Sequence, residues 1–274
     1  MKQTLCISLS LFIWSCSENN FNDSDLSTSF YENDQKKEEG YMKDEKKQGR
    51  WTAWYENGNV KTKGKFKNGL FQGEQKKWFE NGQIEKIYNY NNNKMNGIQE
   101  EWYEDGVQKA RWKYKDGLLH GKQVEWYANG AKKLQGYRKK DKMDGRWTYW
   151  HENGFKRGET TAINGRPDGY QFEWYHNGVL KQKGKFENGI RQGEWILWYA
   201  NGEMEGKTIL KKGQPDGLAT IWYDNGTKKN EGSYQMGKRV GKWLFWEKNG
   251  EIDKEEAYEN GNLIYTRSGV INDR

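Results

Sequence analysis

The stretch Trp54-Tyr55-Glu56-Asn57-Gly58 decides the fold, because the chain repeats its frame at a fixed interval. A tryptophan returns every 24 residues, which makes nine copies of the frame. These anchor tryptophans are Trp54, Trp78, Trp102, Trp126, Trp150, Trp174, Trp198, Trp222 and Trp246. A glycine precedes each anchor by five residues, from Gly49 to Gly241. Such a period predicts a repeat architecture in which each unit contacts only its neighbours.

Each repeat carries two turn signals. Asn-Gly or Asp-Gly next to aromatic residues is the strongest short-range signal for a β-hairpin. The second signal lies 15 residues past an anchor, at Asn68-Gly69, Asp116-Gly117, Asn164-Gly165, Asn188-Gly189 and Asn260-Gly261. Two turns per repeat leave two strands of about 5–7 residues. We therefore predict an all-β fold, an elongated single-layer antiparallel meander of about ten β-hairpin repeats, on the order of 90–100 Å long.

The composition agrees with a thin repetitive body. Only 33% of the 274 residues are hydrophobic, too few for a conventional core, yet 15% are aromatic, which argues against disorder. The net charge is +7, but acidic residues are interspersed among the lysines. Lysine on an exposed sheet keeps its edges from aggregating. We therefore interpret the basic charge as solvation of the sheet and expect no nucleic-acid partner.

The register of the first turn stays open at this point. Side chains alternate along a strand, so the anchor tryptophans and the tyrosines that follow them should form ladders on opposite faces. With a two-residue turn, Trp54 pairs with Lys61, and the equivalent cations stack on the tryptophans. With a three-residue turn and a bulge at the glycine, Trp54 pairs with Val60 instead.

The N-terminus resembles an export signal. Lys2 is followed by a mostly apolar stretch from Thr4 to Trp14 that is too short to span a membrane. Ile13-Trp14-Ser15-Cys16 is similar to the lipobox of bacterial lipoproteins, although Trp14 stands where a small residue is usual. The resemblance implies a signal peptide over residues 1–15, a lipid on Cys16, and anchorage to a membrane of the bacterial cell envelope. Cys6 would leave with the signal, so we expect no intrachain disulfide.

The sequence predicts three segments in the chain. Phe30-Tyr31-Glu32-Asn33-Asp34 lies one period before Trp54 and looks like a decayed capping repeat. We expect a signal peptide over 1–15, a tether over 16–29, and a repeat array over 30–274.

The repeat unit resembles a known family. The pattern Gly-x-x-x-x-Trp-Tyr-x-Asn-Gly, followed by Lys-x-x-Gly-x-Phe-x-x-Gly, occurs at 49–69 and 169–189. It is similar to the MORN-repeat variant of bacterial proteins, over about residues 30–265. Many such proteins are described as the YwqK-type antitoxin of toxin–antitoxin systems, and eukaryotic relatives as binders of phospholipid. The resemblance implies a hairpin-repeat fold; it says less about function.

No catalytic constellation stands out in the sequence. His120 falls in a predicted turn, while His151 and His176 occupy slots of opposite parity and are expected to face opposite sides. The glycines follow the repeat period and serve turns, so they do not form a nucleotide cradle. We expect no enzyme activity, no metal and no cofactor.

Binding is the favoured class of function. Tyr- and Trp-rich surfaces suit protein partners, and any site should lie where the repeats deviate, such as around Trp150 and His151. We expect a monomeric, non-enzymatic, exported lipoprotein whose repeat sheet is a scaffold for protein–protein interaction; the alternatives are an antitoxin or immunity-type protein, or a phospholipid-binding module at a membrane surface. The candidate binding face consists of Trp51, Tyr103, Tyr127, Trp147, Tyr149, Tyr175, Trp195, Tyr199 and Trp243.

Overall fold

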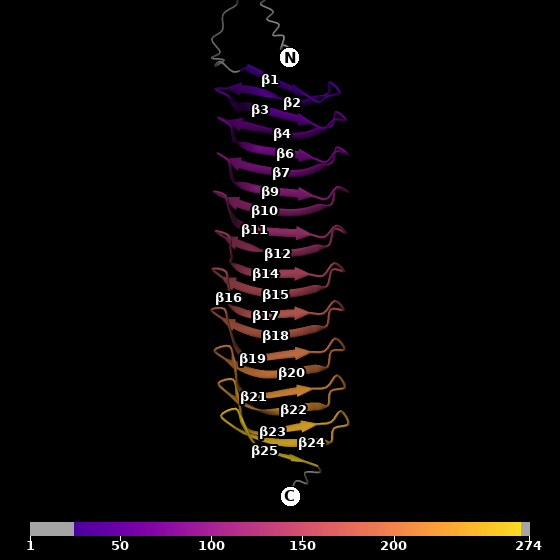
Figure 1. The fold of residues 1–274 in the computed structure, drawn as a ribbon, viewed down its shortest axis with the longest axis vertical. Helices are drawn as coiled ribbons and strands as arrows, with labels where there is room; N and C mark the ends of the chain where they lie inside the picture. Colours follow the sequence, from indigo (N-terminus) through magenta and orange to yellow (C-terminus); the bar gives the residue numbers. More distant parts are fainter. Residues whose placement is uncertain (1–24, 270–274) are drawn as a thin grey trace, which may run out of the picture.

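A single antiparallel sheet makes up the described part of the chain. The computed structural model describes residues 25–269, and all of their strands join one elongated sheet (Figure 1). Each strand pairs with its neighbours in sequence, so the sheet is a meander with β1 (Asp25–Phe30) at one end and β25 (Asn262–Ser268) at the other. The predicted all-β, single-layer meander of hairpin repeats is confirmed, and it does not close on itself.

The strands follow the repeat period. Four of them, β5, β8, β13 and β16, are two-residue pieces separated from the next strand by a single residue. The strands between the two ends are β2 (Lys36–Lys43), β3 (Lys46–Trp54), β4 (Val60–Lys67), β5 (Leu70–Phe71), β6 (Gly73–Trp78), β7 (Ile84–Asn91), β8 (Lys94–Met95), β9 (Gly97–Trp102), β10 (Gln108–Lys115), β11 (Leu118–Trp126), β12 (Lys132–Lys139), β13 (Lys142–Met143), β14 (Gly145–Trp150), β15 (Lys156–Ile163), β16 (Arg166–Pro167), β17 (Gly169–Trp174), β18 (Leu180–Glu187), β19 (Ile190–Trp198), β20 (Met204–Lys211), β21 (Gln214–Trp222), β22 (Lys228–Gln235), β23 (Lys238–Trp246) and β24 (Ile252–Glu259).

The first turn of each repeat is a three-residue loop with a glycine bulge. In the first full copy the Tyr55 N–H donates to the Asn59 carbonyl at 2.8 Å, and the Gly58 N–H donates to the Tyr55 carbonyl at 3.0 Å. Gly58 has a φ of 86°, the left-handed conformation that this turn requires. Trp54 therefore pairs with Val60, which settles the register in favour of the bulged turn.

The cations consequently stack on the tyrosines. Lys61 lies in a second bulge, and its Nζ is 5.2 Å from the centre of the Tyr55 ring. The same cation–aromatic pair recurs as Lys109 over Tyr103, Lys133 over Tyr127, Lys181 over Tyr175 and Lys229 over Tyr223. The alternative in which these cations stack on the anchor tryptophans is wrong, because the bulged turn shifts the pairing by one residue.

The second turn of each repeat is a two-residue turn. Asn68 and Gly69 both have positive φ, at 51° and 79°, which defines a type I′ two-residue turn. The Gly69 N–H donates to the carbonyl of Lys47 at 2.9 Å, so each of these turns is tied to the preceding repeat. Both turn columns are visible as the two looped edges of the array in Figure 1.

The sheet begins earlier than expected. Residues 25–29 belong to β1, which pairs with β2, so the expected tether over 16–29 is wrong for its last five residues. The capping segment keeps the repeat contacts: the Tyr31 hydroxyl donates to the Trp54 carbonyl at 2.8 Å, and Asp34 takes the glycine position with a φ of 61°. The signal peptide over 1–15 and Cys16 lie outside the described residues.

The buried tryptophans belong to one row of side chains on one face of the sheet, and Ala110, Val124, Ala162 and Leu210 are buried outside this row. The row alternates between positions ten residues after an anchor and three residues before the next one, and we call it the core row. It contains all four tryptophans that lie three residues before an anchor, and their exposed fractions are only 1–6%. Each indole lies flat on a glycine of the preceding strand, as Trp51 on Gly40, Trp147 on Gly136, Trp195 on Gly184 and Trp243 on Gly232.

Candidate functional site

The four extra tryptophans of the candidate binding face are buried, so the prediction that they form a contact surface is wrong. The strand pairing places each of them over a glycine, where a Cβ would come within 2.1–2.3 Å of the indole. A cation covers the indole in every case: Lys47 at 4.1 Å from Trp51, Arg138 at 5.1 Å from Trp147, Arg191 at 4.4 Å from Trp195, and Arg239 at 4.4 Å from Trp243. These residues hold neighbouring strands together.

Four candidate tyrosines form a ladder along the first turns. Each hydroxyl donates to the carbonyl of the next anchor tryptophan, at 2.7–3.0 Å, as Tyr103 to Trp126, Tyr127 to Trp150, Tyr175 to Trp198 and Tyr199 to Trp222. A net contribution of about 0.5–1.5 kcal/mol per hydrogen bond is typical. These tyrosines therefore have a structural role, and Tyr149, which lies outside the ladder, needs separate treatment.

The ladder changes where His151 replaces tyrosine. His151 Nε2 lies 3.1 Å from the Trp174 carbonyl oxygen, the contact that a tyrosine makes elsewhere. The ring of His176 is 5.1 Å away from that of His151, and its Nδ1 is 3.0 Å from Nδ2 of Asn153. The prediction that the two histidines face opposite sides is wrong, because both stand in turns, where strand alternation does not apply.

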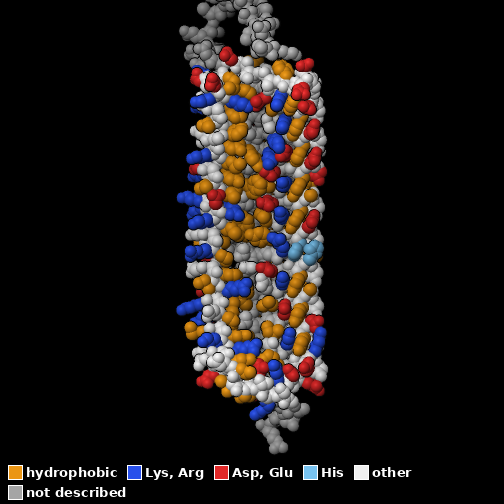
Figure 2. Space-filling model, in the orientation of Figure 1, with side chains coloured by type: hydrophobic (Ala, Val, Ile, Leu, Met, Phe, Trp, Pro, Cys, Tyr) orange, Lys and Arg blue, Asp and Glu red, His pale blue; other side chains and the backbone are white. Residues whose placement is uncertain are grey.

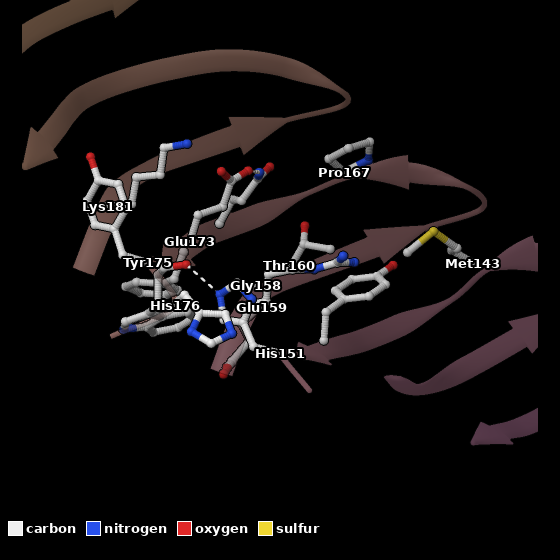
Figure 3. Close-up of a pocket in the computed structure, with 15 residues that line it drawn as sticks. Met143, His151, Gly158, Glu159, Thr160, Pro167, Glu173, Tyr175, His176 and Lys181 are labelled. Carbon is white, nitrogen blue, oxygen red and sulfur yellow. Dashed lines mark hydrogen bonds between the residues drawn. The ribbon is translucent and has the colours of Figure 1, made fainter. Parts of the chain in front are cut away.

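An open groove lies beside this histidine pair. Its volume is about 690 Å³, and its residues, drawn in Figure 3, come from strands β13 to β18 and from the first turns that hold His151 and His176. We call it the His151 groove. It is lined by Met143, Tyr149, His151, Arg157, Gly158, Glu159, Thr160, Pro167, Gln171, Phe172, Glu173, Trp174, Tyr175, His176 and Lys181.

Two small residues open the groove. Thr160 occupies a core-row position, and Gly158 stands two residues earlier on the same face of β15. A Cβ built on Gly158 would meet its nearest atoms, the Phe172 carbonyl oxygen and Tyr149 Cδ2, at 3.7 Å. That is ordinary contact, so a side chain would fit here, and its absence leaves the floor of the groove open.

The groove walls combine aromatic, cationic and amide groups. The Arg157 guanidinium lies 5.7 Å from the Tyr149 ring centre, and Gln171 Nε2 donates to Glu173 at 2.8 Å. Burial raises the pKa of Tyr149, with Arg157 acting in the opposite direction, so its hydroxyl is protonated at neutral pH. Tyrosine and arginine are the residue types most often found at binding hot spots. The groove thus lies in the region around Trp150 and His151, where the sequence predicted a site.

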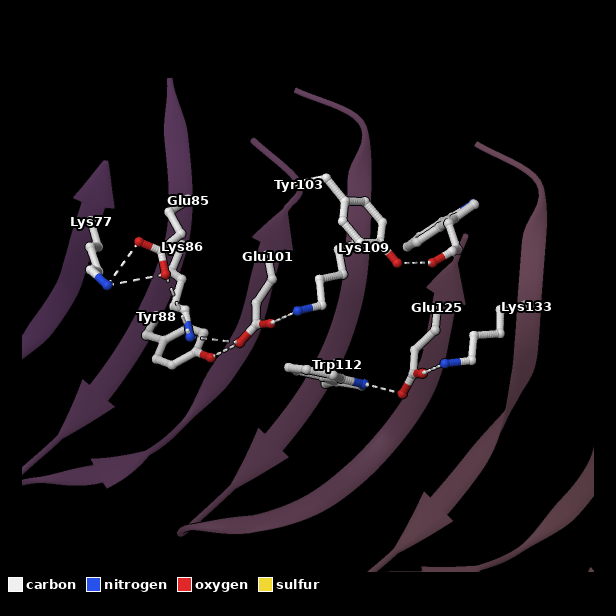
Figure 4. A network of polar contacts seen from close by, with 11 residues as sticks. Lys77, Glu85, Lys86, Tyr88, Glu101, Tyr103, Lys109, Trp112, Glu125 and Lys133 are labelled. Carbon is white, nitrogen blue, oxygen red and sulfur yellow. Dashed lines mark hydrogen bonds and ion pairs between the residues drawn. The ribbon is translucent and has the colours of Figure 1, made fainter. Parts of the chain in front are cut away.

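A second polar cluster has a structural explanation. Glu101 and Glu125 project from β9 and β11 on the core-row face (Figure 4). Lys86 and Lys109 lie 3.4 and 3.8 Å from Glu101, and Tyr88 donates to it. Burial, and then this hydrogen bond, raise the pKa of Tyr88. At Glu125, the Trp112 Nε1–H donates to Oε1 at 3.3 Å, and the Lys133 Nζ lies 4.0 Å from Oε2.

These carboxylates are neutralised by neighbouring lysines, so they link strands and are not poised as an acid–base pair. Among residues 25–269, no group of three or more His, Cys, Asp or Glu side chains could hold a metal ion. Within the same range no helix is long and apolar enough to cross a membrane.

The visible face in Figure 2 carries an apolar stripe along the array, flanked by lysine and arginine side chains. Histidine side chains gather at the edge formed by the first turns.

Comparisons with known proteins agree on the repeat. The family model described as MORN repeat variant matches residues 47–68, 71–92, 167–188 and 215–236. No curated protein matches the chain. The crystal structure of TcdB2-TccC3-Cdc42 is 10% identical over 85% of this chain and 14% of that one, with a TM-score of 0.20. The crystal structure of TcdB2-TccC3 is 9% identical over 85% and 15%, with the same score.

The chain spans about one seventh of the length of these solved structures, and at such a TM-score the likeness carries no information about fold or function. The four family matches fall on hairpins of the meander and share its 24-residue phase, since 47, 71, 167 and 215 differ by multiples of that period. The chain therefore contains repeats of the MORN repeat variant at these four places.

Proposed function

We propose that this protein is a non-enzymatic scaffold for protein–protein interaction and that it binds its partner at the His151 groove. The observation that carries the proposal is the opening of the core-row face at Gly158, where an added Cβ would meet no neighbouring atom closer than 3.7 Å. The repeated Trp, Tyr and Asn residues are engaged in contacts between repeats. The groove instead presents Tyr149, Arg157 and the histidine pair to the outside.

The composition of the groove suits a protein partner better than the composition of a purely charged surface would. Aromatic and arginine side chains in a concave site supply most of the binding energy at protein interfaces. The groove has two acidic residues: Glu173 accepts a hydrogen bond from Gln171, and Glu159 pairs with Arg146 and Lys156. The site therefore offers recognition by packing and hydrogen bonding, with Arg157 and Lys181 available for an acidic group of the partner.

A capture experiment tests the proposal. Gly158→Leu fills the groove, and Leu134, which stands at the equivalent place one repeat earlier, shows that leucine is accommodated there. Asn230→Leu makes the equivalent change three repeats later, outside the groove. A partner captured by the wild type and by Asn230→Leu should be lost with Gly158→Leu. Equal capture by all three proteins would refute the groove as the binding site.

The partner's identity also separates the scaffold from the alternative of an antitoxin. A small protein whose expression is toxic without this chain would favour the antitoxin function. Any other recovered protein favours the scaffold. Retention on anionic vesicles in place of protein capture would favour the phospholipid-binding module instead.

We further propose that the protein is exported and anchored by a lipid on Cys16. The support is the sequence of residues 1–16, with its apolar stretch and its lipobox-like end. Metabolic labelling with a radioactive fatty acid should mark the wild-type protein and leave a Cys16→Ser variant unmarked. Equal labelling of both proteins would contradict the anchor.

A further inference from the structure

The core row contains five glycines: four lie ten residues after an anchor tryptophan, and Gly40 lies ten residues after Phe30 of the capping segment. Four of the five are covered by a tryptophan of the following strand. Three of those indoles also donate Nε1–H to a backbone carbonyl of the preceding strand: Trp51 to Tyr41 at 3.1 Å, Trp147 to Tyr137 at 3.0 Å and Trp243 to Ser233 at 3.2 Å. The fifth glycine is Gly64, and it has no tryptophan above it.

The surroundings of Gly64 are nevertheless those of a tryptophan site. Gly64-Lys65-Phe66 repeats the sequence Gly184-Lys185-Phe186, whose glycine is covered by Trp195. Phe186 packs edge-on against that indole with ring centres 5.2 Å apart. Above Gly64 stands Gln75, whose Nε2 donates to the Lys65 carbonyl at 2.8 Å. Gln75 thus takes over the hydrogen bond of the indole without supplying its ring.

A hollow of about 390 Å³ results, a size typical of small-molecule pockets. We call it the Gly64 hollow. Its floor is Gly64 with the Gln75 amide, and aromatic rings form much of its wall. Phe71 lies between two other rings, at 4.8 and 5.1 Å between ring centres. The aromatic residues that line the hollow are Trp51, Phe66, Phe71, Tyr88 and Tyr90.

Lysines also line the hollow, and two of them lie over its rings: the Lys47 Nζ is 4.1 Å from the centre of the Trp51 ring and the Lys86 Nζ is 5.7 Å from that of Tyr88. The lining lysines are Lys47, Lys76, Lys77 and Lys86, and their side chains are 32–42% exposed. Glu38 is the one carboxylate among the lining residues, and it pairs with Lys47. Glu85 lies outside the lining, 2.8 Å from Lys77 and 3.9 Å from Lys86. Lys86 also lies 3.4 Å from Glu101, so an incoming anion competes with Glu85 at both lysines and with Glu101 at Lys86.

We propose that the Gly64 hollow binds a small planar aromatic carboxylate, whose ring takes the place of the missing indole and whose carboxylate meets Lys77 and Lys86. The four filled sites of the core row show that this environment accepts an aromatic ring. The lysines select a negatively charged one, because an aromatic face alone attracts cations. This inference does not depend on the proposed function, since the hollow and the His151 groove share no lining residue.

Titration of the full chain with indole-3-acetate tests the proposal by calorimetry. The wild type should bind one equivalent. Gln75→Trp should bind none, because it fills the hollow as Trp195 fills its own site. The urea midpoint of this variant should equal or exceed that of the wild type, which separates loss of binding from loss of fold.

Charge variants test the position of the carboxylate. Glu85→Gln should tighten binding and Lys86→Gln should weaken it, each by about threefold, as expected of partly exposed ion pairs. Neutral indole-3-acetamide should bind more weakly than the acid and show no response to either change.

A reciprocal variant provides a specificity control. Trp147→Gln should uncover Gly136 and leave the Tyr137 carbonyl with an amide donor, but the stoichiometry should stay at one, because Met143, Thr160 and Ala162 stand where the hollow has Phe71, Tyr88 and Tyr90. Three results would overturn the proposal: no binding by the wild type, unchanged binding by Gln75→Trp, or equal affinity for the acid and the amide.

Discussion

Glycine-to-alanine changes on the core-row face should stabilise or destabilise the fold according to which atoms cover each glycine. At Gly136 a Cβ would come within 2.1 Å of Trp147 Cδ2, whereas at Gly158 the nearest atoms stand at 3.7 Å. Neither glycine has a positive φ, so backbone strain does not enter the comparison. The two variants therefore isolate the effect of the indole.

The magnitudes follow from packing. Relief of the clash at Gly136 needs a displacement of more than 1 Å by an indole that is only 2% exposed. Overpacking of this kind costs about 2–3 kcal/mol. Alanine at Gly158 meets no obstacle and lowers the entropy of the unfolded chain, which stabilises by about 0.5 kcal/mol.

Urea unfolding followed by tryptophan fluorescence is the assay. We expect a lower urea midpoint for Gly136→Ala and an unchanged or higher midpoint for Gly158→Ala. The dependence of the unfolding free energy on urea concentration should also be compared between the variants, because a repeat array can lose two-state behaviour. At Gly64 the obstacle is the flexible end of Gln75, so Gly64→Ala should fall between the two. Equal midpoints for Gly136→Ala and Gly158→Ala would refute the stacking of tryptophan on glycine as the basis of the core.

Three further predictions concern stability. Trp150→Ala, in the middle of the array, should lower the urea midpoint more than Trp54→Ala, because it uncouples longer folded segments on both sides; equal midpoints would contradict this. Tyr127→Phe removes the hydroxyl that donates to the Trp150 carbonyl and should cost about 0.5–1.5 kcal/mol, whereas a change within error would show that the ladder contributes nothing. Lys254 lowers the pKa of Glu256, so the stability from this carboxylate is complete above the ordinary glutamate pKa and is lost as the pH falls through the lowered value. The gap in midpoint between the wild type and Glu256→Gln should therefore shrink at acid pH, and a constant gap would contradict the ion pair.

The architecture was predictable from the sequence because local signals repeat without interruption. Asn-Gly turns at two phases of the period dictate hairpins, and hairpins joined end to end can form only a meander. The turn register was not predictable, since a type I′ turn and a bulged three-residue turn both accept Asn57-Gly58. The bulge at Lys61 then decides which aromatic residue each cation covers.

The site was only partly predictable. Deviation from the repeat pointed to the neighbourhood of His151, where the groove lies. The burial of Trp147 was missed, although the glycine at position 136 carried the signal: a large residue opposite a glycine on the neighbouring strand lies over it. Strand parity misplaced His151 and His176, because alternation holds within strands and ends at the turns.

The central claim is that the repeated residues hold the array together and that binding occurs where the repeats differ. Photo-crosslinking in the producing cell tests this most directly, with p-benzoylphenylalanine placed at the exposed position 181, which lines the groove, or at the equivalent position 229 two repeats later. We predict a discrete crosslinked protein from position 181 and none from position 229. The same adduct from both positions, or no adduct from position 181, would contradict the claim.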